Sequence, residues 1–326
     1  MRPHAALLAD IGGTRARFAL LRPGEERPSA SVELASADFR DLESAARGAL
    51  EELCADEPGA PEVREAAVAV AAPVLGDRVE LTNVDWTFSI EATRRALDLG
   101  RLEVVNDVAA VAHALPGLGP SDWRALHSGR TGATGPRAVL SIGTGLGMAL
   151  EVSPGVSFEP LVLSTEGGHR DLAAASELEW RIVERLSERF SGHVSVERAV
   201  SGEGIGALYG CLSELVEASP EVLPPAEIGR RALAGEPRAV EALALWSGWL
   251  GAVAGDAALT CGATGGVWIA GGVVPRLGAA FDEARFRERF LAKGRFRSWL
   301  ERVPVRLLVA PDAAFRGLAR RLASAR

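Results

Sequence analysis

The chain has 326 residues, of which 48% are hydrophobic and 24% are charged, and its formal net charge is −7. This length exceeds the usual size of a single hydrophobic core, so we expect two lobes. The acidic balance argues against nonspecific nucleic-acid binding, which relies on a basic surface. The 3 cysteines are far apart and odd in number, which excludes a disulfide framework and a Cys-x-x-Cys metal site.

Two apolar stretches lack the form of a targeting or membrane segment. Residues 5–9 are too few for a signal peptide. Residues 257–275 carry no charge but are interrupted by glycines and end in a proline, which predicts a helix end, a turn and a buried strand. We therefore expect a soluble cytoplasmic protein with neither a membrane nor a nucleic acid as partner.

The first predicted element is a hairpin around a glycine turn. Two apolar segments, residues 7–11 and 16–21, flank Gly12-Gly13-Thr14. Glycines let backbone N–H groups face an anion, and the threonine hydroxyl adds a donor. Because a strand follows the turn, it is neither a P-loop nor a dinucleotide fingerprint, both of which need a helix there. An ordinary hairpin turn is the alternative for this segment taken alone.

Strands and helices then alternate, which is typical of an α/β lobe. The expected strands are 32–34, 66–71 and 102–105, and the expected helices are 39–54 and 108–115. The sequence Pro-Gly-Leu-Gly-Pro at 116–120 breaks the chain, so we predict a small lobe over 1–117 and a large lobe over 118–310. A C-terminal helix within 311–326, capped by Asp312, is expected to pack back on the small lobe.

The large lobe contains a second hairpin of the same kind. Residues 138–142 lead into Gly143-Thr144-Gly145, and residues 146–152 lead out. Two such hairpins, more than a hundred residues apart, predict a duplicated domain that binds the phosphates of one nucleotide.

Helical and strand patterns continue through the rest of the large lobe. We expect helices over 177–190 and 238–259 and strands over 267–270 and 305–309. Ser176 and Glu179 match a capping box at the start of the first helix. Gly248, Gly251 and Gly255 predict that the second helix closely approaches a neighbour.

Asn106 and Asp107 stand between a predicted strand and a predicted helix. Open α/β sheets bind ligands at the carboxyl ends of their strands. Asp107 is therefore either a helix cap or a catalytic base for a substrate hydroxyl. As a base, it would be kept ionised by the helix N-terminus, which suits phosphoryl transfer.

Further polar residues lie in two loops. Glu166 and His169 flank two glycines and can hold vicinal sugar hydroxyls, and the other histidines offer no metal-ligand spacing with His169. The role of Glu197 is open, with an exposed surface residue as the alternative. The segment from Asn83 to Ser89, with Trp86 inside it, is either functional or a packed surface loop.

Taken together, these segments resemble the bacterial glucokinase family. The matching segments, in the order of the family from residue 7 to about residue 309, are Asp10–Thr14, Thr82-Asn83 with Trp86, Asn106-Asp107, Gly143–Gly147, Glu166–His169, Glu197-Arg198 with Ser201-Gly202, Ile269–Arg276 and Lys293–Phe296.

The resemblance implies a two-lobed actin-like ATPase (ribonuclease H-like) fold of duplicated α/β domains with a cleft between them. It implies transfer of the γ-phosphate of ATP to the 6-hydroxyl of D-glucose, a need for Mg²⁺, and a homodimer. Carried over to this sequence, Asp107 is the base, and the sugar is held by Asn83, Asn106, Asp107, Glu166, His169 and Glu197. The ATP phosphates are held by Gly12, Gly13, Thr14, Gly143, Thr144 and Gly145. Asp10 lies near Mg²⁺, directly or through water, and Gly271 and Gly272 face the adenosine.

Three departures from the family pattern matter. Arg15 stands where the family usually has Asn, and Ala72 replaces a usual glycine before Pro73. No cysteine cluster follows His169, so the zinc-containing branch is not expected. A kinase for another hexose, such as mannose or glucosamine, and a catalytically silent sugar sensor are the alternatives, and the presence of Asp107 argues against the sensor.

Overall fold

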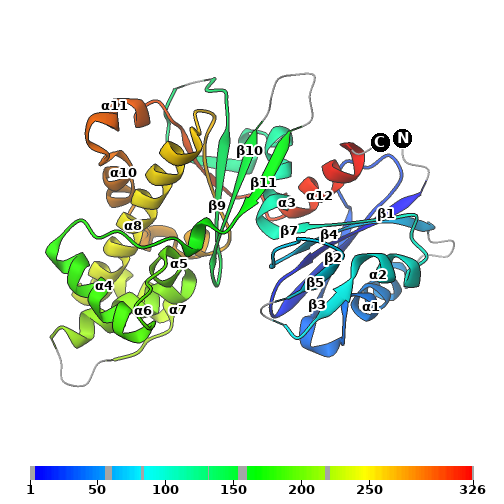
Figure 1. The fold of residues 1–326 in the computed structure, drawn as a ribbon, viewed down its shortest axis with the longest axis horizontal. Coiled ribbons are helices and arrows are strands. Elements are labelled where there is room, and N and C mark those ends of the chain that lie inside the picture. Colours follow the sequence, from blue (N-terminus) through cyan, green and yellow to red (C-terminus); the bar gives the residue numbers. More distant parts are fainter. Residues whose placement is uncertain are drawn as a thin grey trace. The chain divides into compact units, whose positions relative to one another are not determined.

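The computed structural model describes residues 4–55, 61–81, 84–130, 132–152, 160–216 and 221–324. The chain divides into two compact units. The first comprises Met1–Gly119, Val162–Ser164 and Ala310–Arg326, and the second comprises Pro120–Leu161 and Thr165–Val309. Figure 1 shows the elements of each unit.

The first unit is built on a five-stranded sheet with the order β3-β2-β1-β4-β7 (Figure 1). Its strands are β1 (Ala5–Ile11), β2 (Arg15–Leu21), β3 (Ala30–Ala35), β4 (Val63–Val70) and β7 (Arg101–Asn106). β2 runs antiparallel to β1, β4 runs parallel to β1, and β7 runs parallel to β4. Leu7 and Ile11 of the central strand join one apolar cluster and Leu8 joins another, because successive side chains point to opposite faces.

Helices cover both faces of this sheet. They are α1 (Leu42–Cys54), α2 (Ile90–Ala96), α3 (Asp107–Ala114) and α12 (Ala313–Ser324). Ala45 and Ala49 of α1 pack with Leu7, whereas Leu318 and Leu322 of α12 pack with Leu8 on the other face. The C-terminal helix is thus part of the core of the first unit.

Helices α12 and α3 pack against each other at very short range. A Cβ atom added to Gly317 would overlap the backbone carbonyl oxygen of Ala110. Only glycine allows this approach of the two backbones.

The second unit repeats the topology of the first. Its six-stranded sheet has the order β11-β10-β9-β12-β13-β8, and the middle residues of the edge strand β11 are the segment Val162–Ser164 counted with the first unit. The strands are β8 (Trp123–His127), β9 (Arg137–Ile142), β10 (Leu146–Val152), β11 (Leu161–Thr165), β12 (Gly266–Ala270) and β13 (Val305–Leu308). β9 and β10 form an antiparallel hairpin, with β12 parallel to β9 and β13 parallel to β12, as β1, β2, β4 and β7 do in the first sheet. The predicted duplication is therefore confirmed. The edge strand β8 was not predicted, since two of its five residues are exposed side by side and it lacks alternation.

The remaining elements are mostly helices of the second unit. They are α4 (Glu177–Arg189), α5 (Val196–Ala199), α6 (Gly202–Glu214), α7 (Pro225–Leu233), α8 (Pro237–Cys261), α9 (Val273–Leu277), α10 (Glu283–Leu291) and α11 (Arg297–Leu300), with the small sheet β5 (Arg78–Glu80) and β6 (Thr87–Ser89) in the first unit. Short 3-10 turns lie at η1 (Ser36–Asp38), η2 (Leu115–Gly117), η3 (Pro120–Asp122), η4 (Gly167–His169), η5 (Gly278–Ala280) and η6 (Gly294–Phe296).

The long helix α8 forms the centre of the second unit. Among the described residues it is the one helix apolar and long enough to span a membrane, yet 78% of its most apolar window is buried in the protein. A Cβ on Gly251 would overlap the carbonyl of Phe286, and one on Gly255 would lie 2.7 Å from that of Phe290. The predicted close approach is confirmed, and the neighbour is α10.

The predicted capping box of α4 forms only in part. Ser176 accepts a hydrogen bond from the backbone N–H of Glu179 at 3.2 Å. The carboxylate of Glu179 does not return to Ser176, however; it accepts from the N–H of Ala175 at 2.7 Å and pairs with Arg289 of α10. A buried carboxylate gains more from a guanidinium than from a second backbone donor, so the tertiary contact prevails.

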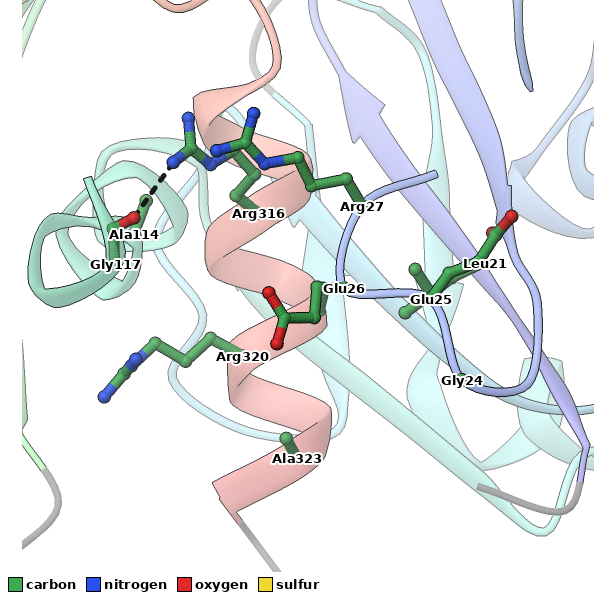
Figure 2. Close-up of a pocket in the computed structure, with 11 residues that line it drawn as sticks. Leu21, Gly24, Glu25, Glu26, Arg27, Ala114, Gly117, Arg316, Arg320 and Ala323 are labelled. Carbon is green, nitrogen blue, oxygen red and sulfur yellow. Dashed lines mark hydrogen bonds between the residues drawn. The ribbon is translucent and has the colours of Figure 1, made fainter. Parts of the chain in front are cut away.

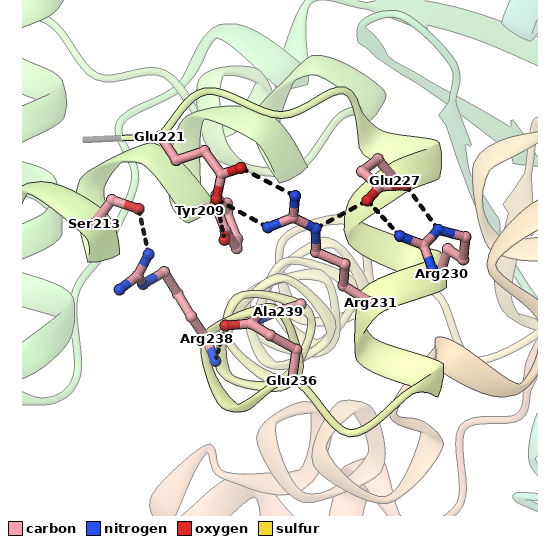
Figure 3. A network of polar contacts seen from close by, with 9 residues as sticks. All are labelled: Tyr209, Ser213, Glu221, Glu227, Arg230, Arg231, Glu236, Arg238 and Ala239. Carbon is pink, nitrogen blue, oxygen red and sulfur yellow. Dashed lines mark hydrogen bonds and ion pairs between the residues drawn. The ribbon is translucent and has the colours of Figure 1, made fainter. Parts of the chain in front are cut away.

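A chain of charged side chains ties α7 to its neighbours (Figure 3). Arg231 bonds Glu221 at 2.9 and 3.0 Å and Glu227 at 2.9 Å, and Glu221 accepts from the Tyr209 hydroxyl of α6 at 3.2 Å. Glu227 also bonds Arg230 of the same helix at 2.6 and 2.8 Å. Helix α7 is short and buries few of its own residues, so these polar contacts add to its limited apolar packing.

Helix α1 begins three residues later than the predicted start at residue 39. Asp41 is its N-cap and accepts from the N–H of Ser44 at 2.8 Å, while Ser44 Oγ accepts from the N–H of Asp41 at 3.3 Å. This reciprocal cap defines where the helix starts.

Candidate active site

Three parallel strands of the first unit end at the same edge of its sheet. Asp10 lies near the end of β1, paired with Ala69 of β4, and Asn106 ends β7, paired with Val70 of β4. Asn106 Nδ2 donates to the carbonyl of Ala72 at 3.5 Å. The carboxyl edge of the sheet therefore gathers Asp10, Asn106 and Asp107, as the sequence predicts for a ligand site.

Asn106, and not Asp107, is the N-cap of α3. Its Oδ1 accepts from the N–H groups of Val108 and Ala109 at 3.0 and 3.3 Å. Asp107 is the first residue of the helix, and its Oδ1 accepts from Val108 N–H at 2.8 Å. The N-cap position of α3 is thus held by the neighbour of Asp107, and it is Oδ1 of Asp107 that accepts from the helix N-terminus.

The pKa of Asp107 is raised to about 6. Burial is the main cause, and repulsion from the negative charge of Asp10 adds to it, while hydrogen bonds from the helix N-terminus and Asn106 oppose the rise. The sequence predicted a carboxylate kept ionised by the helix N-terminus. The hydrogen bonds of the helix N-terminus do lower the pKa, but desolvation outweighs them and the net shift is upward. A pKa near 6 suits a base that works near neutral pH.

The first glycine turn closes the β1–β2 hairpin. The N–H of Gly12 donates to the carbonyl of Arg15 at 2.9 Å, and the N–H of Ser36 donates to the carbonyl of Thr14 at 3.1 Å. Both flanking strands are present, so the predicted hairpin is confirmed. Arg15 itself is exposed and pairs with Glu33 on β3.

Arg17 is a residue of this edge that sequence reasoning missed. It stands opposite Asp10 in the hairpin register, and its guanidinium pairs with the Asp10 carboxylate. Nη1 also donates to the carbonyl of Pro311 at 3.2 Å, and the guanidinium lies 5.4 Å from the ring centre of Phe315 in α12. The hairpin register around Gly12-Gly13 was the signal that would have found it, since a charged residue opposite Asp10 interrupts an apolar strand.

In the second unit, the carboxylate of Glu197 contacts the second glycine turn. The backbone N–H of Leu146 donates to Glu197 Oε2 at 2.8 Å, and a Cβ on Gly145 would overlap that oxygen. The N–H of Gly202 donates to the carbonyl of Gly143 at 2.8 Å. Glu197 is therefore not a free surface residue, and a sequence separation of 51 positions from Leu146 explains why the sequence left its role open.

The Glu166–His169 segment is held against β10. A Cβ on Gly168 would overlap the carbonyl of Leu146, and one on Gly167 would lie 2.5 Å from the sulfur of Met148. The carboxylate of Glu166 and Nε2 of His169 lie 3.8 Å apart, both largely exposed. The two glycines thus allow close packing that presents the polar pair outward.

His169 and Glu197 line one polar cavity of about 360 Å³. Arg198 also lines it, and its guanidinium lies 4.2 Å from the ring centre of Phe190. Two of the sugar-binding residues implied by the family resemblance therefore meet in the second unit.

Gly271 and Gly272 follow β12, the strand next to β9. Gly271 has a φ of +87°, and a Cβ there would overlap the carbonyl of Ile142, the residue before the second glycine turn. Since β9 and β12 are parallel, both glycine segments lie at the same edge of the second sheet.

Two sequence predictions have different outcomes in the loop around Trp86. Asn83 lies outside the described residues. Trp86 is buried, and its indole N–H donates to the carbonyl of Phe39 at 2.9 Å, which is the packed-loop alternative. Among the described residues, no group of three His, Cys, Asp or Glu side chains forms a metal cage.

Comparisons with known proteins match this chain to glucokinases over nearly its whole length. The sequence model described as Glucokinase matches residues 7–325. The glucokinase of Aromatoleum aromaticum is 43% identical over 323 residues, which cover 99% of this chain and 96% of that protein. A glucokinase crystal structure from an Antarctic psychrotroph superposes with a TM-score of 0.84 at 35% identity, covering 99% of this chain and 100% of that one. A glucokinase from Balamuthia mandrillaris, solved with glucose, gives 0.80 at 20% identity and covers 97% and 92%, which supports the fold alone.

The duplicated strand order and the match to these structures identify an α/β protein with the actin-like fold. The family match over residues 7–325 and the identity of 43% over 323 residues show that the chain shares the family as well as the fold. The chain belongs to the glucokinase family, the enzymes that phosphorylate glucose.

Proposed function

We propose that the chain transfers the γ-phosphate of ATP to the 6-hydroxyl of D-glucose, with Asp107 as the base. The observation that carries the proposal is the position of Asp107 at the carboxyl edge of the first sheet, beside Asp10 and with a pKa raised to about 6. Asn106 is the N-cap of α3, and the Asp107 oxygen that does not accept from the N–H of Val108 is the one proposed to accept the proton.

In this mechanism the 6-hydroxyl oxygen attacks the γ-phosphorus as Asp107 accepts the hydroxyl proton. The new oxygen–phosphorus bond forms as the bond to the β-phosphate oxygen breaks, and ADP leaves. Positioning and charge stabilisation dominate phosphoryl transfer, so the base mainly aligns the hydroxyl and takes the proton late.

We assign sugar binding to Asn83 and Asn106, and to a second group made of Glu166, His169 and Glu197. Carboxylates accept hydroxyl protons and an imidazole donates or accepts, so vicinal hydroxyls find complementary partners. The shared polar cavity of His169 and Glu197 supports this assignment.

The nucleotide is assigned to the two glycine turns. Gly12, Gly13 and Thr14 on one hairpin, and Gly143, Thr144 and Gly145 on the other, are proposed to hold the phosphates. Gly271 and Gly272 are proposed to face the adenosine. The shared edge of β9 and β12 supports an adenosine subsite next to the second turn.

Mg²⁺ is assigned to Asp10, directly or through water. Magnesium prefers oxygen ligands and is usually held by one or two carboxylates together with substrate phosphates. A single carboxylate beside a phosphate turn fits this preference, and Asp10 also pairs through Oδ2 with the Arg17 guanidinium. When bound with ATP, the ion neutralises charge on the phosphates.

The base assignment is tested with Asp107→Asn, which keeps the shape and removes the proton acceptor. General-base loss lowers the rate by about 10²–10⁴-fold, so we expect kcat to fall by that factor while glucose affinity changes far less. Asp98→Asn, which alters an exposed aspartate of the same unit, is the matched control. A variant that keeps more than about a tenth of wild-type kcat would exclude Asp107 as the base.

Other assignments belong to the same proposal: a homodimer, a cytoplasmic location, and lobes over 1–117 with 311–326 and over 118–310 that close around the substrates. A smaller radius of gyration in small-angle scattering with glucose tests the closure, and sedimentation tests the dimer. An ADP-release assay with glucose, mannose and glucosamine tests which hexose is preferred.

A further inference from the structure

A surface cavity of about 550 Å³ lies in the first unit, away from the carboxyl edge of its sheet (Figure 2). Its walls are the loop after β2, the C-terminal end of α3, and α12. The floor is apolar and is made of Leu21, Ala114, Ala319 and Ala323. Charged side chains line it from both walls: Glu25, Glu26 and Arg27 from the loop, and Arg316 and Arg320 from α12, with Arg320 directed away from the loop in Figure 2.

Arg316 is the fixed member of this charged set. Its side chain is 7% exposed, and Nη2 donates to the carbonyl of Gly117 at 3.0 Å. The guanidinium also lies 3.8 Å from the carboxylate of Asp312. A guanidinium held in this way has a fixed orientation beside the cavity.

Arg27 and Arg320 are exposed at the mouth of the cavity. Neither pairs with a carboxylate among the residues that the structure describes. Most other exposed arginines of the first unit do have such partners, for example Arg78 with Glu80 and Arg64 with Asp98. Three guanidinium groups therefore line the cavity against two carboxylates, Glu25 and Glu26, and Glu25 already accepts from the backbone N–H of Arg22 at 2.9 Å.

We propose that this cavity binds a small phosphate monoester that carries hydroxyl groups, such as a phosphorylated polyol or sugar. Guanidinium groups bind phosphate oxygens through charge-assisted hydrogen bonds. The carboxylate of Glu26 repels a bare anion but accepts hydrogen bonds from hydroxyls. The alanine floor suits the C–H face of a short carbon chain, and the volume is within the range of small-molecule sites.

The probe is glycerol 3-phosphate, which has one phosphate and two hydroxyls. Calorimetric titration into the full-length protein, with glucose and a non-hydrolysable ATP analogue at saturation, keeps the probe out of the active site. We expect saturable binding at one site per chain. The Arg27→Gln/Arg320→Gln variant should bind at least about tenfold more weakly, since each charge-assisted hydrogen bond is worth roughly that factor.

Arg78→Gln, which also removes an exposed guanidinium from the first unit, is the matched control and should bind like wild type. Glu26→Gln distinguishes recognition of the hydroxyls from recognition of the phosphate. We expect this variant to bind glycerol 3-phosphate more weakly than wild type does and to bind inorganic phosphate equally well. Equal affinity in the double variant and the control, or no saturable binding, would overturn the site. Inorganic phosphate that binds as tightly as the ester would overturn the hydroxyl-bearing class. Because binding is read without turnover, these results are independent of whether Asp107 is the base.

Discussion

The carboxylate of Glu197 accepts a hydrogen bond from the backbone N–H of Leu146, 2.8 Å away, within the second glycine turn. A residue proposed to hold the sugar is thereby fixed to a turn proposed to hold a phosphate. The glycine before Leu146 makes this possible, because any side chain there would occupy the space of the carboxylate oxygen. The proposed sugar subsite and the proposed phosphate turn are therefore linked by a direct hydrogen bond.

Gly145→Ala should weaken glucose binding in the absence of nucleotide. The new methyl group displaces the Glu197 carboxylate and breaks its bond to Leu146, so we expect the Kd for glucose to rise about tenfold, the usual worth of one hydrogen bond to a charged group. Gly143→Ala is the control, since a Cβ there meets nothing within 4 Å. Calorimetry on both variants gives the answer, and equal glucose affinities would contradict the link.

The rate should fall on the acid side of pH 6. Asp107 accepts a proton only when it is ionised, and its pKa is about 6. We expect kcat/KM for glucose to be level above that pH and to decrease about tenfold per pH unit well below it. The measurement is a pH–rate profile at saturating ATP, and a profile that stays level down to pH 5 would contradict the assignment.

Asp107→Asn should also make the protein more stable at alkaline pH. The folded pKa of about 6 lies above the model value of 3.8, so the folded state binds the proton more tightly than the unfolded chain. The stabilisation from this group is full below pH 3.8 and is lost as the pH rises through 6. At pH 8 its ionised form lowers the free energy of unfolding by about 2–3 kcal/mol, at about 1.4 kcal/mol per pKa unit.

Thermal melts at pH 8 and pH 4 measure this difference. The variant should melt above wild type at pH 8, and the two curves should converge toward pH 4. A wild type that is the more stable protein at pH 8 would show that the carboxylate is not destabilised in the fold.

Gly317→Ala should destabilise the first unit. The added methyl group would overlap the carbonyl oxygen of Ala110, and neither backbone can move without parting α12 from α3. Overpacking of this kind lowers the free energy of unfolding by about 1–3 kcal/mol. Gly229→Ala in α7 is the control, because its methyl group would meet only Leu277 Cδ2 at 3.7 Å.

Denaturant unfolding compares the two variants. The control should be unchanged or gain up to about 1 kcal/mol, as alanine is the better helix former. If Gly317→Ala unfolds at the same denaturant concentration as the control, α12 does not pack on α3 as described.

Local sequence determined the elements that carry the site. A short glycine turn between two apolar strands favours a hairpin, since a parallel crossover needs a longer connection, so Gly12–Thr14 and Gly143–Gly145 indicated both hairpins and the duplication. Asn106-Asp107 at a strand end indicated the carboxyl edge of a sheet. The glycines of α8 indicated a close neighbour, since glycine in a helix interior is costly without one.

Tertiary structure decided what depends on groups far apart in the chain. The pKa of Asp107 follows burial and the charge of Asp10, which outweigh the helix dipole that the sequence alone displays. Glu197 finds Leu146 across 51 residues, and Glu179 leaves its local cap for Arg289. Short-range patterns determine which backbone conformations are accessible, whereas desolvation and charge pairing depend on which segments pack together, and that is settled only when the chain has folded.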